Sequence, residues 1–152
     1  MDTAALLEKF QSRVKEIERL QELIHKAKSQ SSRFSRAVVE KVVKDNTAKI
    51  LDITQKLAPV VAEVSSTIST LKGKRDGVMV GTQEAKFTLQ ELELRHLIGE
   101  YDESEYAELS AAPRETVEQA DSQVAALEGQ VGALEGAMSQ WSSIADKIGI
   151  TA

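Results

Sequence analysis

The feature that most constrains the fold is a spacing of three and four residues between apolar side chains, sustained along most of the chain. Side chains at this spacing share one face of an α-helix. Aromatic residues make up only 4% of the 152 residues and the first 72 contain no glycine, which disfavours a β-sheet protein. The sequence therefore predicts an all-α fold. The spacing is most regular at Val117, Ala120, Val124, Leu127, Val131, Leu134, Met138, Trp141, Ala145 and Ile148.

The first arm of the predicted fold covers residues 3–72. Apolar side chains recur at helical spacing from Leu7 to Ile24 and again from Val39 to Leu71. The serine-rich patch at 29–32 separates the two sets. Serine competes for backbone hydrogen bonds, so the patch is either a weak point in one helix or a true break. We expect the helix to continue through it.

The apex is predicted at residues 73–82, which hold Gly73, Gly77 and Gly81. Glycine is favoured where a helix ends and the chain turns. The second arm then covers residues 83–148, and its first apolar face is expected to carry Phe87, Leu94 and Leu97.

A break is predicted in the second arm at residues 99–113. Gly99 is expected to end one helix, and Asp102-x-x-Glu105 is typical of a capping box that starts a short helix. Pro113 suits the first turn of the helix that follows.

Two arms of nearly equal length can pair along their whole length. Residues 1–75 carry a net charge of +6 and residues 76–152 a net charge of −11, and complementary charges beside a helical seam select partner and orientation. The alternative is that these charges only solvate each helix. The sequence thus predicts one helical domain over residues 1–152, a long, coiled-coil-like antiparallel hairpin completed by oligomerisation.

Apolar and small residues outside the main stripes predict a partner surface. Three glycines inside a helix cost about 1 kcal/mol each relative to alanine, and small residues let another helix approach closely. The hypothesis is a contact with another helix, most simply a second copy in a homodimer; the alternative is that the glycines are tolerated at solvent. The predicted partner interface consists of Leu20, Leu23, Ala27, Leu89, Leu92, Gly129, Gly132 and Gly136.

Both histidines lie in a Glu-x-x-His pattern, as Glu22 with His25 and Glu93 with His96. That spacing is found among the ligands of di-iron carboxylate four-helix bundles, which makes a di-metal oxidase a remote alternative. Only 21 residues precede Glu22, too few for the ligand-bearing helix that such bundles place first, so coincidence is favoured. We predict no metal, no cofactor and no catalytic residue.

Other functional classes are disfavoured by composition. There is no cysteine, the net charge is −5, and no run approaches the roughly 18 apolar residues of a membrane span. The start of the chain lacks a basic segment followed by an apolar core. These features predict a cytoplasmic location, no membrane span and no nucleic-acid partner.

Residues 94–109 resemble the short C-terminal domain of prokaryotic proteins, a small helix-turn-helix. Gly99 fits the helix end, Asp102 the acidic cap, and Glu105 with Tyr106 the start of the second helix. The resemblance covers 16 residues and implies a prokaryotic source and self-association.

The sequence as a whole predicts a non-enzymatic adaptor or scaffold that binds proteins, or its own copy, through long helical faces. The alternative is a rod or spacer in an envelope, cytoskeletal or secretion assembly.

Overall fold

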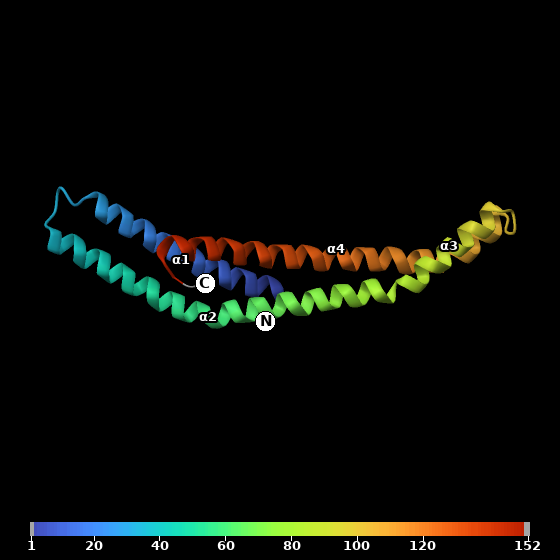
Figure 1. Cartoon of the computed structure of the whole chain (residues 1–152), viewed down its shortest axis with the longest axis horizontal. Coiled ribbons are helices and arrows are strands. Elements are labelled where there is room, and N and C mark those ends of the chain that lie inside the picture. Colours follow the sequence, from blue (N-terminus) through green and yellow to red (C-terminus); the bar gives the residue numbers. More distant parts are fainter. Residues whose placement is uncertain (1, 151–152) are drawn as a thin grey trace. The chain divides into compact units, whose positions relative to one another are not determined.

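Four α-helices dominate the computed structural model, which describes residues 2–150 (Figure 1). The described residues contain no β-strand, so the prediction of an all-α fold is confirmed. The helices are α1 (Thr3–Ser29), α2 (Arg36–Gly81), α3 (Gln83–Leu97) and α4 (Glu103–Ile148).

The described residues form two compact units, whereas one domain was expected. Unit 1 comprises residues 2–68 and 133–150, and unit 2 comprises residues 69–132. α1 belongs to unit 1 and α3 to unit 2, while α2 and α4 each contribute to both.

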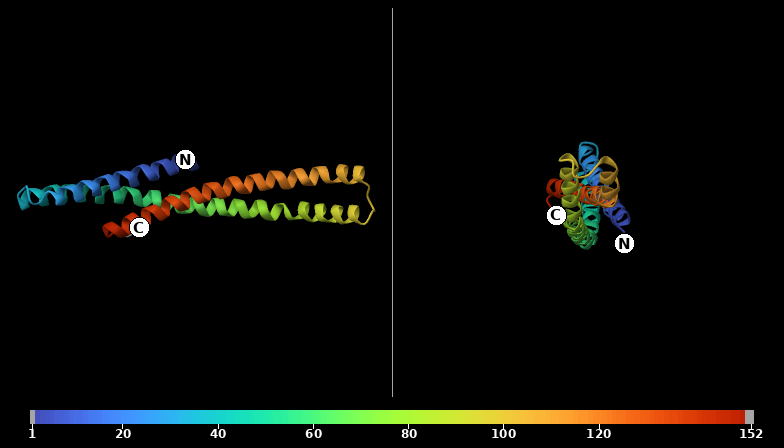
Figure 2. Two further views of the ribbon diagram at one scale, coloured as in Figure 1. Left: turned by 90° about the horizontal axis from the view of Figure 1, so that it is seen from above. Right: turned by 90° about the vertical axis from the view of Figure 1, so that its right-hand side faces the viewer.

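Unit 1 packs α1 with the first part of α2 and the last part of α4 (Figure 2). α1 and α4 line shared grooves in the same order along the chain: Phe10 lies beside Ala137, and His25 lies beside Lys147. These two helices therefore run in the same direction, and α2 runs against both (Figure 1). The expected antiparallel pairing of the opening and closing stretches is wrong, because the chain reverses twice between them, at residues 30–35 and 98–102.

The core of unit 1 is built from the predicted helical spacing. Phe10, Ile17, Leu57 and Leu134 are completely buried. Full burial of one such side chain contributes about 1.5 to 3 kcal/mol. The apolar core residues of this unit are Leu6, Phe10, Val14, Ile17, Leu20, Ile24, Ile50, Leu57, Val60, Val64, Leu134, Ala137, Trp141 and Ala145.

The serine-rich patch at 29–32 is a true break, so the expected continuity of the first helix is wrong. α1 ends at Ser29, where the Ser29 and Ser31 hydroxyls donate to the carbonyls of Lys26 and Lys28, at 2.6 and 2.8 Å. Side-chain hydrogen bonds of this kind offer the backbone an alternative to the helical ladder. Six residues later the Ser35 hydroxyl accepts from the N–H of Val38 as α2 begins.

The predicted apex at 73–82 is helical, and that prediction is wrong. α2 continues to Gly81, and the N–H of Thr82 donates to the Val78 carbonyl at 3.1 Å. The N–H of Lys86 in turn donates to the Thr82 carbonyl, so the ladder passes into α3 with little interruption. Glycine permits a turn without requiring one, and none of these three glycines has a positive φ.

The reversal between α3 and α4 lies at residues 98–102, with Gly99 at φ +86°. The N–H of Glu100 donates to the Arg95 carbonyl at 2.8 Å, and the N–H of Gly99 donates to the His96 carbonyl at 3.1 Å. These two bonds form a Schellman motif, which favours glycine at the left-handed position. Gly99 is thus the helix end that was predicted, but it is also the apex of the hairpin in unit 2.

α4 begins directly after this turn, and the predicted N-cap at Asp102 is confirmed. Asp102 Oδ1 accepts from the N–H of Glu105 at 2.8 Å. The predicted break as far as Pro113 is wrong, because α4 runs unbroken from Glu103 to Ile148 with this proline inside it. Pro113 removes one backbone hydrogen bond to the carbonyl of Leu109, an exposed residue where water can replace the lost donor.

Candidate protein-binding site

The seam between the helices of unit 2 buries small and polar side chains as well as large apolar ones. Thr82, Ser110 and Ala120 are buried there, with exposed fractions of 3%, 1% and 8%. The buried large apolar residues of this unit are Leu71, Leu92 and Val131. Burial of apolar area is the main stabilising contribution to folding, so the small buried residues contribute less to it than the large ones.

Several large apolar side chains of unit 2 lie outside the seam. Val80, Phe87, Leu94 and Ile98, here called the α3 stripe, are 70%, 67%, 57% and 68% exposed. Steps of seven and four residues place them on one helix face. Leu97, beside them, is also exposed. The apolar face predicted to carry Phe87, Leu94 and Leu97 is thus exposed, and the buried residue of α3 is Leu92.

The α3 stripe ends at a turn that several contacts connect to α4. The rings of His96 and Tyr106 stack across the hairpin with centroids 4.5 Å apart and an interplanar angle of 11°. His96 Nδ1 also lies 3.1 Å from the Tyr101 carbonyl oxygen. Together with the Schellman motif at Gly99, these contacts hold the end of α3 against α4. The stripe is thus presented on a helix whose end is fixed.

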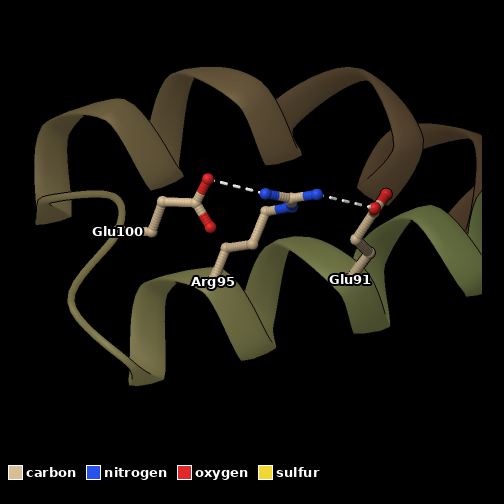
Figure 3. Close-up of polar contacts among 3 residues, drawn as sticks. All are labelled: Glu91, Arg95 and Glu100. Carbon is tan, nitrogen blue, oxygen red and sulfur yellow. Dashed lines mark hydrogen bonds and ion pairs between the residues drawn. The ribbon is translucent and has the colours of Figure 1, made fainter.

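One arginine bridges two carboxylates at this turn (Figure 3). Arg95 Nη2 donates to Glu91 Oε1 at 3.2 Å, and Arg95 Nη1 donates to Glu100 Oε1 at 2.6 Å. The hydrogen bond that Arg95 donates to Glu91 and the charge of Glu100 raise the pKa of the Arg95 guanidinium above its usual value. The charge of Arg95 is therefore paired with Glu91 and Glu100 on the same turn. The neighbouring carboxylates Glu84 and Glu93 have no ion pair within the described part of the chain.

The residues predicted to form the partner interface do not form one surface. Leu20 and Leu92 are buried in the cores of unit 1 and unit 2, so placing these two on an outer face was wrong. Ala27 and Leu89 are half-buried, and Leu23 is exposed. The three glycines, at 129, 132 and 136, are exposed, and a Cβ built on any of them meets no atom within 4 Å.

The two Glu-x-x-His pairs lie in different units, Glu22 with His25 in α1 and Glu93 with His96 in α3. Across residues 2–150, no group of three or more metal-binding side chains comes together. The first pair lines an open groove of about 570 Å³ between α1 and α4, which also contains Ile144 and Lys147.

Sequence reasoning missed the exposed α3 stripe. The seven-residue repeat at Val80, Phe87 and Leu94 is visible in the sequence, but the expected apex at 73–82 assigned its first member to a turn. The helical conformation of residues 73–81 could not be foreseen from a glycine-rich composition.

Comparisons with protein-family models, curated proteins and solved structures find no match to this chain. Within residues 2–150, no helix combines the length and the apolar character needed to cross a membrane. The family relation suggested for residues 94–109 therefore stays a prediction.

Proposed function

We propose that this protein is a non-enzymatic, cytoplasmic helical adaptor that binds a helical segment of a protein partner through the α3 stripe. One observation carries the proposal: unit 2 exposes a row of large apolar side chains, Val80, Phe87, Leu94 and Ile98, on one helix face. Contiguous exposed apolar surface is typical of interaction sites, since soluble proteins rarely leave it uncovered.

The spacing of the stripe favours a helix as the bound element. Val80, Phe87 and Leu94 repeat every seven residues, a spacing that suits a second helix packed alongside. From the first to the last of these three residues the stripe extends about 21 Å at 1.5 Å per residue. Recognition of a helix through residues at such intervals is a common binding mode.

Acidic residues beside the stripe restrict the choice of partner. Glu84 and Glu91 lie within about 60° of Phe87 around the helix axis, since each residue turns by about 100°. Both side chains are exposed. The favoured partner is therefore a helix with an apolar face bordered by lysine or arginine.

Site-specific cross-linking in the source cell tests the proposal. A photoreactive phenylalanine analogue in place of Phe87 or Leu94 is expected to yield discrete cross-linked species, whether with another protein or with a second copy. The matched control is the same analogue at Ser122, an exposed polar position on α4 of the same unit. Equal labelling at Phe87 and Ser122, or none at either stripe position, would contradict the proposed function.

A further inference from the structure

The turn between α1 and α2 presents another exposed apolar surface. We call residues 26–44 the basic turn. In it Phe34, Val38 and Val42 follow one another every four residues and are 54%, 52% and 41% exposed. The N–H of Val38 donates to the Ser35 hydroxyl, which orders the start of α2 beneath these side chains. The basic turn thus carries a short apolar stripe of its own.

This turn is strongly positive. It contains six lysine or arginine residues and one acidic residue, Glu40, all of them exposed. Arg36 pairs with Glu40 at 2.7 Å. Arg33, Lys41 and Lys44 have no ion-pair partner within residues 2–150. The positive charge around Phe34 and Val38 is therefore mostly uncompensated.

The surroundings of the α3 stripe have the opposite charge. Residues 83–109 contain eight acidic residues and two basic ones, Lys86 and Arg95. Arg95 is already engaged with Glu91 and Glu100. The same chain therefore carries two apolar stripes of opposite charge, one in each unit.

We propose that the α3 stripe of one copy binds the basic turn of a second copy. This inference rests on the proposed function, in which the α3 stripe is a binding site. Burial of Phe34 and Val38 against Phe87 and Leu94 would supply the apolar contact. Lys41 and Arg33 would face the carboxylates that border the stripe, which fixes orientation and speeds association. The contact joins two different surfaces, so the pair of copies keeps one stripe and one basic turn free, and assembly continues into rings or open chains.

A second copy fits both surfaces better than a lipid bilayer does. A basic turn with an exposed phenylalanine could approach an anionic membrane. The acidic stripe would be repelled by the same membrane and would stay uncovered. Pairing between copies covers both stripes at once.

Analytical ultracentrifugation of the full-length protein tests this assembly. The stripe variant carries Phe87→Ser and Leu94→Ser, and the turn variant carries Phe34→Ser and Val38→Ser. The wild type is expected to increase in mass with concentration. Each variant alone is expected to associate at least about tenfold more weakly, as expected for loss of central apolar anchors.

Mixing the two variants is the decisive measurement. The stripe variant retains an intact basic turn and the turn variant retains an intact stripe, so an equimolar mixture is expected to form a one-to-one heterodimer and nothing larger. Raising NaCl from about 0.05 M to about 0.5 M is expected to weaken wild-type association, because screening shortens the reach of the charges. Leu51→Ser and Leu109→Ser, at exposed apolar positions outside both surfaces, are the matched controls and are expected to assemble as the wild type does.

Three results would overturn this inference. A turn variant that assembles like the wild type would indicate a symmetric stripe-to-stripe contact. A wild type that stays monomeric while its turn binds anionic lipid vesicles would assign the turn to a membrane. A wild type that stays monomeric at every concentration, while Phe87 still cross-links to another protein in cells, would refute self-association and leave the proposed function standing.

Discussion

The same chemical change, glycine to alanine, is expected to have opposite effects at two positions of unit 2. Gly99 has φ +86°, and a Cβ there meets no atom within 4 Å, so the whole cost of Gly99→Ala is conformational. A left-handed conformation costs a residue other than glycine about 1 to 2 kcal/mol. For a chain of this size, that loss lowers the melting temperature by about 2 to 8 °C.

Gly132→Ala is the matched comparison. Gly132 lies inside α4, is exposed, and also has open space around a built Cβ. Alanine stabilises the middle of a helix by about 0.5 to 1 kcal/mol relative to glycine. Gly132→Ala is therefore expected to raise the stability of unit 2.

Urea and thermal unfolding, followed by far-UV circular dichroism, measure both changes. Amide hydrogen exchange in residues 103–110 serves as a local probe of the turn, because the two units need not unfold together. A Gly99→Ala variant as stable as the wild type would refute the left-handed turn. A destabilising Gly132→Ala would show that Gly129, Gly132 and Gly136 pack against a neighbouring helix, as the hypothesis drawn from the sequence supposes.

Three further predictions address capping, core packing and charge. Asp102→Ala is expected to remove the cap of α4 and lower the free energy of unfolding by about 1 kcal/mol, measured by urea denaturation. Leu134→Ala should cost about 2 to 5 kcal/mol because its side chain is completely buried, whereas Leu97→Ala, 81% exposed, should change stability by less than about 0.5 kcal/mol. The hydrogen bond from Arg19 lowers the pKa of Glu16, so Arg19→Ala should raise that pKa in an NMR titration. The stability contributed by this hydrogen bond is present at pH values above the ordinary glutamate pKa and is lost as the pH falls through the lowered pKa of Glu16.

Periodicity predicted the helices better than composition predicted the turns. The core positions Phe10, Val14 and Ile17 follow directly from the three-and-four spacing, because burial of one helix face requires it. The cap at Asp102 was also readable, since its carboxylate and the N–H of Glu105 are only three residues apart. Both signals act within a single helix or turn.

The positions of the turns depended on which glycine the packing of the rest of the chain required at a reversal. Gly73, Gly77 and Gly81 remained helical, whereas the single Gly99 formed the reversal. Thr82, Ser110 and Ala120 become buried once α3 packs on α4, and this pairing exists only if the chain turns at Gly99. The number of glycines in a segment could not reveal that the chain reverses at Gly99.

The sequence by itself determined that this chain is helical, which residues form the apolar faces of α1 and α4, and that the start of α4 is capped. These properties arise from interactions between residues a few positions apart. The tertiary structure alone decided that α1 and α4 run in the same direction, that Leu20 lies in a core, and that the α3 stripe faces outward. A helix with apolar residues on more than one face can bury only one of them against a given neighbour. Which face is buried depends on where distant turns bring that neighbour.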